Sequence, residues 1–293
     1  MDLRIMQYFL AVVREGNISA ASEALHVAQP SLSRQMKELE EELGATLFIR
    51  GNRKITLTEE GMVLRKRAEE IVGLIQRTEE EISQTRGQIT GTIRIGAGES
   101  RVFSFISKAA SRLSENYPGI TVNIKSGDTI DLMDEIANGI LDFAIVFSDV
   151  DETRYDSITL PMADTYGILM RKDSPFASKK SIRFNDLKDE PIIVSRGTQR
   201  HFKNDRLLSK LRIVATYNLI YNASLLVENE LGYAICFDNL INTTGDSPLT
   251  FVPLDPLMEV HGNLIWKKYE VQSPAVNIFL DEIHQLIIGK TDI

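Results

Sequence analysis

Apolar residues near the amino terminus recur with the spacing of an amphipathic helix. Ile5, Phe9 and Val12 fall on successive turns of one helical face. This spacing predicts a first helix over residues 3–14. Gly16 follows it, and a glycine just past the last turn is a common helix stop. The chain therefore opens with a helix that buries one face.

Two shorter helical patterns follow, joined by a tight turn. Ser19 is a good N-cap for a helix over residues 20–26, because its hydroxyl can accept from a free N–H of the first turn. A third helix is predicted over residues 29–43, where Pro30 in the first turn loses no hydrogen bond and Gly44 supplies the stop. This is the layout of a helix-turn-helix, whose second helix enters the major groove of DNA.

The next segment changes to extended spacing and then returns to helix. Residues 48–58 read as two short extended pieces around a Gly-Asn turn, which predicts a small wing. Residues 58–88 form one long predicted helix with Thr58 as its N-cap. Heptad spacing on this helix predicts dimerisation through a partner helix, and packing against its own domain is the alternative. The dimerisation residues are Leu64, Ala68, Ile71, Ile75 and Ile82, with Thr78 completing the seam.

After residue 91, short apolar runs alternate with helix-length segments. Such alternation predicts parallel sheets covered by helices. Two similar units of three strands each predict two lobes. The strand candidates are residues 92–97, 121–125 and 143–147 in the first unit, and residues 191–195, 212–217 and 233–237 in the second. Extended stretches at 159–171 and 249–267 join the units, and a helix over 274–288 returns to the first.

The expected fold class is an N-terminal all-α winged helix-turn-helix with a long linker helix, followed by a C-terminal α/β domain of two parallel-sheet lobes that form a hinged clamp. We expect a DNA-binding domain over residues 1–58, a linker helix and hinge over 59–90, and a two-lobe domain over 91–293. The first lobe comprises residues 91–161 and 266–293, and the second comprises residues 162–265.

Charge does not by itself favour a nucleic-acid partner. The formal net charge is −8, and neither the first ninety residues nor the remainder is basic overall. Attraction to phosphates therefore has to come from a local face. The start of the third helix offers one, because glutamine can read adenine, arginine can read guanine, and serine and lysine grip phosphates. A merely solvated helix face is the alternative. The candidate DNA-binding residues are Ser19, Gln29, Pro30, Ser31, Ser33, Arg34, Lys37, Arg50, Arg53 and Lys54.

A ligand in an open α/β sheet sits outside the carboxyl ends of the strands, against helix N-termini. Those positions hold small hydroxyl residues that suit a carboxylate, phosphate or sulfate, and two arginines that would add bidentate contacts. For any single position, ordinary helix capping is the alternative. The candidate effector-binding residues are Gly98, Ser100, Arg101, Asp128, Thr129, Ser195, Arg196, Thr198 and Asn218.

Enzyme signatures are weak. Arg101 stands where the third glycine of a dinucleotide fingerprint belongs, and no nucleophile elbow or H-E-x-x-H pattern occurs. The single cysteine, Cys236, lies in an apolar run, and the four histidines lack metal-ligand spacing. We therefore expect no catalysis, no cofactor and no metal. The amino terminus does not resemble a signal peptide and no stretch would span a bilayer, so we expect a cytoplasmic protein without a membrane partner.

Residues 3–66 resemble the N-terminal domain of LysR-type transcriptional regulators. The match is carried by F-L-A-V-V-R-E-G-N-I-S-A-A-S-E-A-L-H-V-A-Q-P-S-L-S-R-Q-M-K-E-L-E-E-E-L-G-A-T-L-F-I-R and then L-T-E-E-G. The remainder follows the family in layout, with a linker helix and an effector domain similar to periplasmic binding proteins. The resemblance implies a homodimer through the linker helices, commonly a homotetramer, on a partly palindromic double-stranded DNA site.

The same resemblance implies that a small-molecule effector in the cleft changes the lobes and thereby transcription, and an activator would also contact RNA polymerase. Carried over by position, the DNA contacts are Gln29, Pro30, Ser33, Arg34 and Arg53. The implied cleft positions are Ser100, Asp128 or Thr129, the loop 195–198 and Asn218.

Three positions depart from the family pattern. Ala28 stands where serine or threonine is usual, so it cannot cap the third helix. Glu230 replaces a small residue, and Asp238 stands where proline is common. With Glu99 and Asp128, we expect these acids to add negative charge near the cleft, which favours a ligand with a cationic or hydroxyl part over a simple carboxylate.

Two other function classes compete with a regulator. A solute-binding or sensing protein would use only the clamp of residues 91–293, but a transport role requires export, which the amino terminus does not support. An enzyme would need a paired base and nucleophile in the cleft, and the sequence supplies none.

Overall fold

A computed structural model of the chain describes residues 1–50, 55–83, 89–201, 211–269 and 272–291. The chain divides into two compact units, Met1–Thr85 and Arg86–Ile293. Each unit has its own hydrophobic core and is described by itself.

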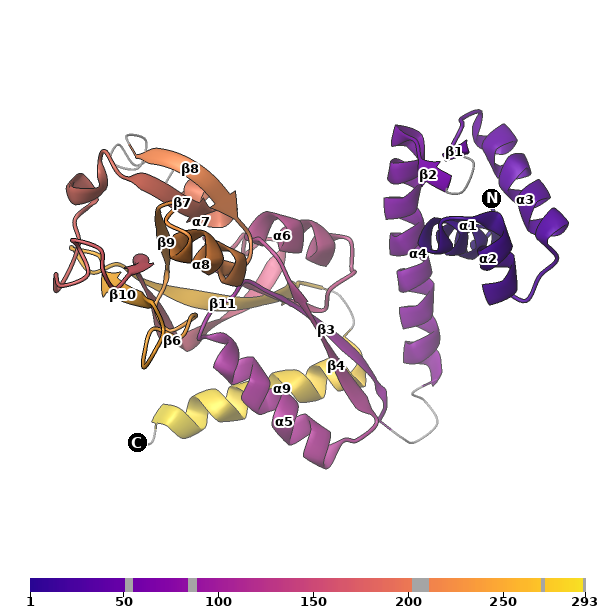
Figure 1. Ribbon diagram of the computed structural model, residues 1–293. Coiled ribbons are helices and arrows are strands. Elements are labelled where there is room, and N and C mark those ends of the chain that lie inside the picture. The colour runs from indigo at the N-terminus through magenta and orange to yellow at the C-terminus, as the bar shows by residue number, and fades with distance from the viewer. Residues whose placement is uncertain (51–54, 84–88, 202–210, 270–271, 292–293) are drawn as a thin grey trace. The chain divides into compact units, whose positions relative to one another are not determined.

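Unit one is helical except for a small hairpin (Figure 1). Its elements are α1 (Leu3–Glu15), α2 (Ile18–Ala24), α3 (Gln29–Leu43), β1 (Phe48–Arg50), β2 (Ile55–Leu57) and α4 (Glu59–Ser83). β1 and β2 pair antiparallel, as expected of a wing, and the turn between them lies outside the described residues. The predicted order of helices and hairpin is confirmed.

The cap of α2 differs from the prediction. Asn17, with an extended backbone, accepts the N–H of Ala20 on its side-chain oxygen at 2.7 Å. Ser19 is therefore inside the first turn of α2 and is not the N-cap. Both residue types are good caps, and the extended backbone at Asn17 decides which one starts the helix.

The turn into α3 agrees with the prediction. Ala28 is the N-cap residue and makes no side-chain hydrogen bond, while Pro30 occupies the first turn. Gly44 ends the helix in the left-handed conformation, with φ at 62°. A side chain is strained at such a φ, so glycine suits this position.

The core of unit one joins all its helices. Phe9 of α1 packs against Leu32 and Met36 of α3, and its ring lies 5.3 Å from that of Phe48. Ala68 of α4 is fully buried in the same cluster. The buried face of α3 holds that helix in place and leaves its opposite face to solvent.

The long helix α4 is buried along one part of its apolar face and exposed along another. Thr58 caps it by accepting the N–H of Gly61 at 3.0 Å, as predicted. Leu64 and Ala68 pack into the core of their own unit, which is the alternative considered for these positions. Ile71 stays 38% exposed, so the unpaired part of the seam begins one turn later. The side chain of Ile82 lies outside the described residues.

Unit two contains two sets of three parallel strands. The first set is β3 (Gly91–Ala97), β4 (Ile120–Ser126) and β5 (Phe143–Val146), with β3 in the middle. The second set is β7 (Pro191–Ser195), β8 (Arg212–Tyr217) and β9 (Tyr233–Phe237), with β7 in the middle. Both predicted parallel units are confirmed. The accompanying helices are α5 (Phe103–Asn116), α6 (Thr129–Ala137), α7 (Arg196–His201), α8 (Ile220–Glu228), α9 (Pro274–Thr291) and the short 3-10 helix η2 (Phe184–Leu187).

Long antiparallel strands join these two sets. They are β6 (Tyr155–Arg171) and β11 (Glu259–Lys267), while β10 (Leu249–Pro253) pairs with β6. The sheet order runs β4-β3-β5-β11-β6-β9-β7-β8. Each lobe therefore contains the predicted parallel strands, and the sheet is mixed because both extended crossovers also pair as strands.

Helices cover both sets of strands (Figure 1). In the first lobe, α5 and α9 pack through Phe105, Ile106 and Phe279 on β3 and β5. In the second, α8 packs through Ala223 and Val227 on β7 and β9. The carboxyl ends of both strand sets are left facing a common cleft. Within the described residues, no helix is long and apolar enough to cross a membrane, and no cluster of His, Cys, Asp or Glu would hold a metal.

Candidate functional site

The opening turns of α3 present a polar face. Gln29, Pro30, Ser31, Arg34 and Lys37 are exposed, and Ser33 is half-buried. Ser19 on α2 is exposed as well. Leu32, Met36 and Leu39 on the other face are buried in the core of unit one. The predicted residues of α3 therefore share an accessible surface. Arg53, Lys54 and the side chain of Arg50 lie outside the described residues.

Both cations of this face are paired with acids on the same helix. Arg34 Nε lies 2.7 Å from Glu38, and Lys37 Nζ lies 3.4 Å from Glu41. The hydrogen bond from Arg34 to Glu38 raises the pKa of the arginine. Both pairs are exposed, so phosphate oxygens can replace the carboxylates without desolvating a buried charge.

Another acid of α3 has a structural role. Glu40 accepts the backbone N–H groups of Leu47 and Phe48 on one oxygen, at 2.8 and 3.2 Å. This contact attaches the start of the wing to α3. Its carboxylate is thereby directed toward the hairpin. The sequence showed only that this acid follows the basic turns.

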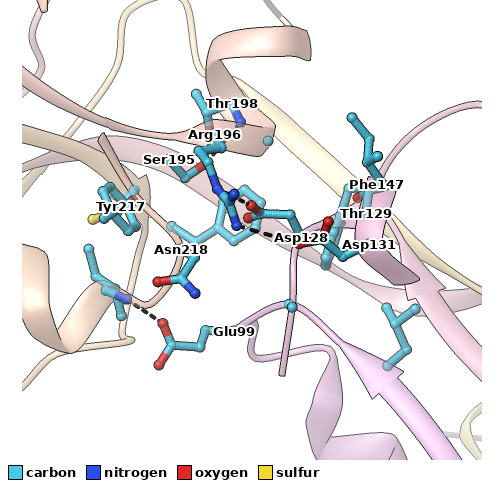
Figure 2. A pocket seen from close by; sticks show the side chains of 18 of the residues that line it. Glu99, Asp128, Thr129, Asp131, Phe147, Ser195, Arg196, Thr198, Tyr217 and Asn218 are labelled. Atoms are coloured by element: carbon cyan, nitrogen blue, oxygen red, sulfur yellow. Dashed lines mark hydrogen bonds and ion pairs between the residues drawn. The ribbon is translucent and has the colours of Figure 1, made fainter. Parts of the chain in front are cut away.

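The second candidate site is a cavity of about 370 Å³ in unit two. Residues after β3, β4 and β5 line one side, and residues after β7, β8 and β9 line the other (Figure 2). It thus lies at the carboxyl ends of both parallel sets, where a ligand was expected. The predicted effector residues that line it are Gly98, Asp128, Thr129, Ser195, Arg196, Thr198 and Asn218.

Ser100 and Arg101, also predicted as effector residues, are not among the lining residues. The Ser100 hydroxyl donates to Asp164 Oδ2 at 2.5 Å, and the Arg101 backbone N–H donates to Asp164 Oδ1 at 3.1 Å. Asp164, on β6, is only 2% exposed, and this burial raises the pKa of its carboxyl, with the two hydrogen bonds opposing the shift. The loop after β3 is therefore bound to the crossover strand β6 through the Ser100 hydroxyl and the Arg101 backbone N–H.

The serine and threonine after β7 bind each other. Thr198 donates its backbone N–H to Ser195 Oγ at 2.9 Å, and the Ser195 hydroxyl donates to Thr198 Oγ1 at 2.8 Å. This is ordinary capping of α7, the alternative considered for such residues. The hydroxyls still border the cavity.

Two contacts bridge the cavity from one lobe to the other (Figure 2). Arg196 at the start of α7 lies 2.7 Å from Asp128 and 3.4 Å from Asp131, at the start of α6. Glu99, after β3, accepts the backbone N–H of Ile220 at the start of α8. Of the two acids that pair with Arg196, only Asp128 was predicted from the sequence as a cleft residue, and Glu99 was expected only to add negative charge near the cleft.

Aromatic side chains form the inner wall of the cavity. The ring of Phe237 lies 5.2 Å from that of Phe147 and 4.6 Å from that of Tyr166. Burial raises the pKa of the neighbouring Cys236 thiol to about 12, so the group stays protonated and unreactive at neutral pH. These rings were not predicted from the sequence, although Phe147 and Phe237 are the last residues of predicted strands.

Two acids that were expected to add charge to the cleft do not line it. Glu230 and Asp238 are not among the lining residues, and Glu230 lies 3.4 Å from Arg171. The described lining side chains with formal charge are Glu99, Asp128, Asp131 and Arg196. These charges could orient a small polar molecule, and among the described lining residues there is no nucleophile paired with a base.

Comparison with protein families decides the identity. Residues 3–62 match "Bacterial regulatory helix-turn-helix protein, lysR family", and residues 86–287 match "LysR substrate binding domain". The chain belongs to the LysR family. The resemblance seen in the sequence is confirmed, and this LysR-type protein is a DNA-binding transcriptional regulator with a substrate-binding domain.

Individual relatives agree with this assignment. The regulator BsdA of Bacillus subtilis (strain 168) is 28% identical over 94% of this chain and 93% of its own. The crystal structure of CbnR, a LysR family transcriptional regulator, matches 98% of this chain and 99% of its own with a TM-score of 0.73 at 19% identity. CbnR complexed with its target DNA matches with a TM-score of 0.70. These structures confirm the fold of a helix-turn-helix followed by a two-lobe domain.

Proposed function

We propose that this LysR-type regulator binds a specific DNA site as a homodimer and that a small-molecule effector in the interlobe cavity controls DNA binding or promoter activity. The observation that carries the proposal is the pair of bridges, Arg196 to Asp128 and Asp131 and Glu99 to Ile220, across one cavity. A ligand that changes these few contacts shifts the equilibrium between lobe arrangements.

The DNA contact is assigned to the exposed face of α3. Gln29 and Arg34 read base edges, while Ser33 and Lys37 grip phosphates. The exposure of this face and the surface pairing of its cations support the assignment. The further proposed contacts are Ser19, Pro30, Ser31, Arg50, Arg53 and Lys54.

The dimer is assigned to α4. Met62, Val63 and Leu74 are 56%, 65% and 55% exposed, and Ile71 is 38% exposed. Large apolar side chains on one long helix favour a partner, because burying them removes apolar surface from water. Dimers of this kind commonly pair again, so we extend the proposal to a homotetramer.

The proposed division of labour follows the chain. Residues 1–58 bind DNA, residues 59–90 link and dimerise, and residues 91–293 hold the effector, with lobes at 91–161 plus 266–293 and at 162–265. The protein works in the cytoplasm, where its DNA is. If it activates transcription, it also contacts RNA polymerase. We assign it no catalysis.

Fluorescence anisotropy with DNA from upstream of its own gene tests the DNA contact. Arg34→Ala loses a base contact and should lower affinity for the site by about 1–3 kcal/mol. Lys37→Ala loses a phosphate contact, so the slope of log K against log salt should fall by about 0.9. Arg183→Ala is the matched control, because Arg183 is an exposed arginine of unit two. Equal affinity for wild type and Arg34→Ala at low salt would reject the assignment of this contact to Arg34.

A promoter reporter tests control by the cleft. Arg196→Ala removes one bridge and leaves unit one unchanged, so reporter output should change while the melting temperature of unit one does not. Arg183→Ala is again the control. An output that does not respond to Arg196→Ala would reject control through the cavity.

A further inference from the structure

The start of α8 is an anion position that the chain fills itself. Helix α8 has nine residues, and its N-cap residue, Leu219, makes no side-chain hydrogen bond. The N-terminal end of a helix attracts a carboxylate through free N–H groups and the helix dipole. Here Glu99, from the other lobe, supplies that carboxylate to the N–H of Ile220. An acidic ligand would have to displace Glu99 to bind there.

The guanidinium group of Arg196 in the cavity is already paired with carboxylates. Arg196 pairs with Asp128 at 2.7 Å and with Asp131 at 3.4 Å. Asp128 is nearly buried, with a side chain 12% exposed, whereas that of Asp131 is 57% exposed. With Glu99, the described lining carries three carboxylates against one guanidinium. The cavity is therefore electrostatically unfavourable for an anion and favourable for a cation.

The remaining surface of the cavity is apolar and suits a ring. The ring of Phe237 stands within contact distance of the rings of Phe147 and Tyr166, and Ile145 and Leu240 add to the apolar wall. Aromatic faces attract cations as well as apolar groups. A volume of about 370 Å³ is at the small end for ligand pockets, so one ring with a short polar arm fills it.

From these contacts we propose that the effector is a small organic cation, an ammonium group on an apolar body the size of one ring. The ring lies against Phe147 and Phe237, and the ammonium group lies between Glu99 and Asp131. The ammonium group competes with Arg196 for Asp131 and so changes one contact between the lobes, while Arg196 keeps Asp128 and the N–H of Ile220 keeps one oxygen of Glu99. This inference rests on the proposed function in one respect, that the effector binds in the interlobe cavity.

Calorimetric titration with three matched probes tests the inference. Phenethylamine, phenethyl alcohol and phenylacetate share a ring and differ in charge. The wild-type chain should bind phenethylamine about tenfold more tightly than phenylacetate, as expected for one charge-assisted contact. Phenethyl alcohol should fall between them.

Two substitutions of Glu99 separate its charge from its hydrogen bond. Glu99→Gln removes the charge but keeps an acceptor for Ile220, so binding of phenethylamine should weaken about tenfold while phenylacetate gains little. Glu99→Ala also frees the N–H of Ile220, so phenylacetate should gain affinity and become the preferred probe. Glu115→Gln, an exposed glutamate of α5 outside the cavity lining, makes the same chemical change and should alter neither affinity.

Three results would overturn the inference. They are wild-type binding of phenylacetate as tight as that of phenethylamine, unchanged preference in Glu99→Ala, and failure of all probes to bind any variant. None of them bears on DNA binding by α3, which the anisotropy measurement with Arg34→Ala decides separately.

Discussion

Two glycines of α4 should respond in opposite ways to the same substitution. A Cβ on Gly61 would lie 2.2 Å from the backbone oxygen of Leu47 and 2.9 Å from Cδ2 of Leu57. The Leu57 side chain can turn away, but the Leu47 oxygen is fixed because it accepts the N–H of Thr58 at 3.0 Å. Gly61→Ala must therefore separate the first turn of α4 from the start of the wing. A Cβ on Gly73 meets nothing within 4 Å.

The magnitudes follow from these distances. Overpacking costs about 1–3 kcal/mol, the loss of the Thr58 hydrogen bond about 1 kcal/mol, and alanine returns about 1 kcal/mol of helix propensity. The net destabilisation by Gly61→Ala is then about 2 kcal/mol, or a fall of about 8–16 °C in the melting temperature of a unit this size. Gly73→Ala keeps only the propensity gain and should raise that temperature by about 4–8 °C.

Differential scanning calorimetry of the full chain measures both variants. The transition of unit one is the one that shifts upward when its DNA is added, because ligand binding stabilises the native state. Gly73→Ala is the matched control, since it changes the same helix outside the heptad seam. If Gly61→Ala melts at the wild-type temperature, the close approach of α4 to Leu47 does not set the position of the wing, and the reasoning fails.

Three further predictions concern the dimer, the DNA face and acid stability. Ile71→Glu and Ile75→Glu each place an unpaired charge in the seam of α4, so light scattering should show half the wild-type mass; an unchanged mass would contradict the α4 dimer. Glu38→Gln releases Arg34 and should strengthen DNA binding on the order of threefold at low salt, as measured by anisotropy; weaker binding would show that the pair orients the arginine. Burial raises the pKa of Asp164, so its contribution to stability is complete below the ordinary value of 3.8 and is lost as pH rises through the raised value. Asp164→Asn keeps a hydrogen-bond acceptor but cannot ionise, so it should not lose this stability as the pH rises. The urea midpoints of variant and wild type should therefore diverge with rising pH. Parallel plots of midpoint against pH would refute the raised pKa of Asp164.

The local pattern of apolar and polar residues was sufficient to predict the helices and strands and most of the exposed face of α3. Helix α3 follows from apolar spacing, an early proline and a terminal glycine, and each of these acts within one or two turns. Leu32 and Met36 are buried on one face of α3, so Gln29 and Arg34 on the opposite face are exposed to solvent. The parallel strand sets and their ligand-facing loops could be predicted for the same reason, because strand and helix periods are properties of neighbouring residues.

The sequence by itself thus determined the family, the order of elements and the loops that border the cavity. Only the tertiary structure decided how those loops are used. It paired β6 and β11 with the parallel sets, directed Ser100 to Asp164, and brought Glu99 to α8 and Arg196 to Asp128. Each of these contacts joins segments far apart in the chain, and their pairing depends on which strands become neighbours. Side-chain periodicity does not specify which strands become neighbours, because the same local pattern is compatible with several arrangements of strands.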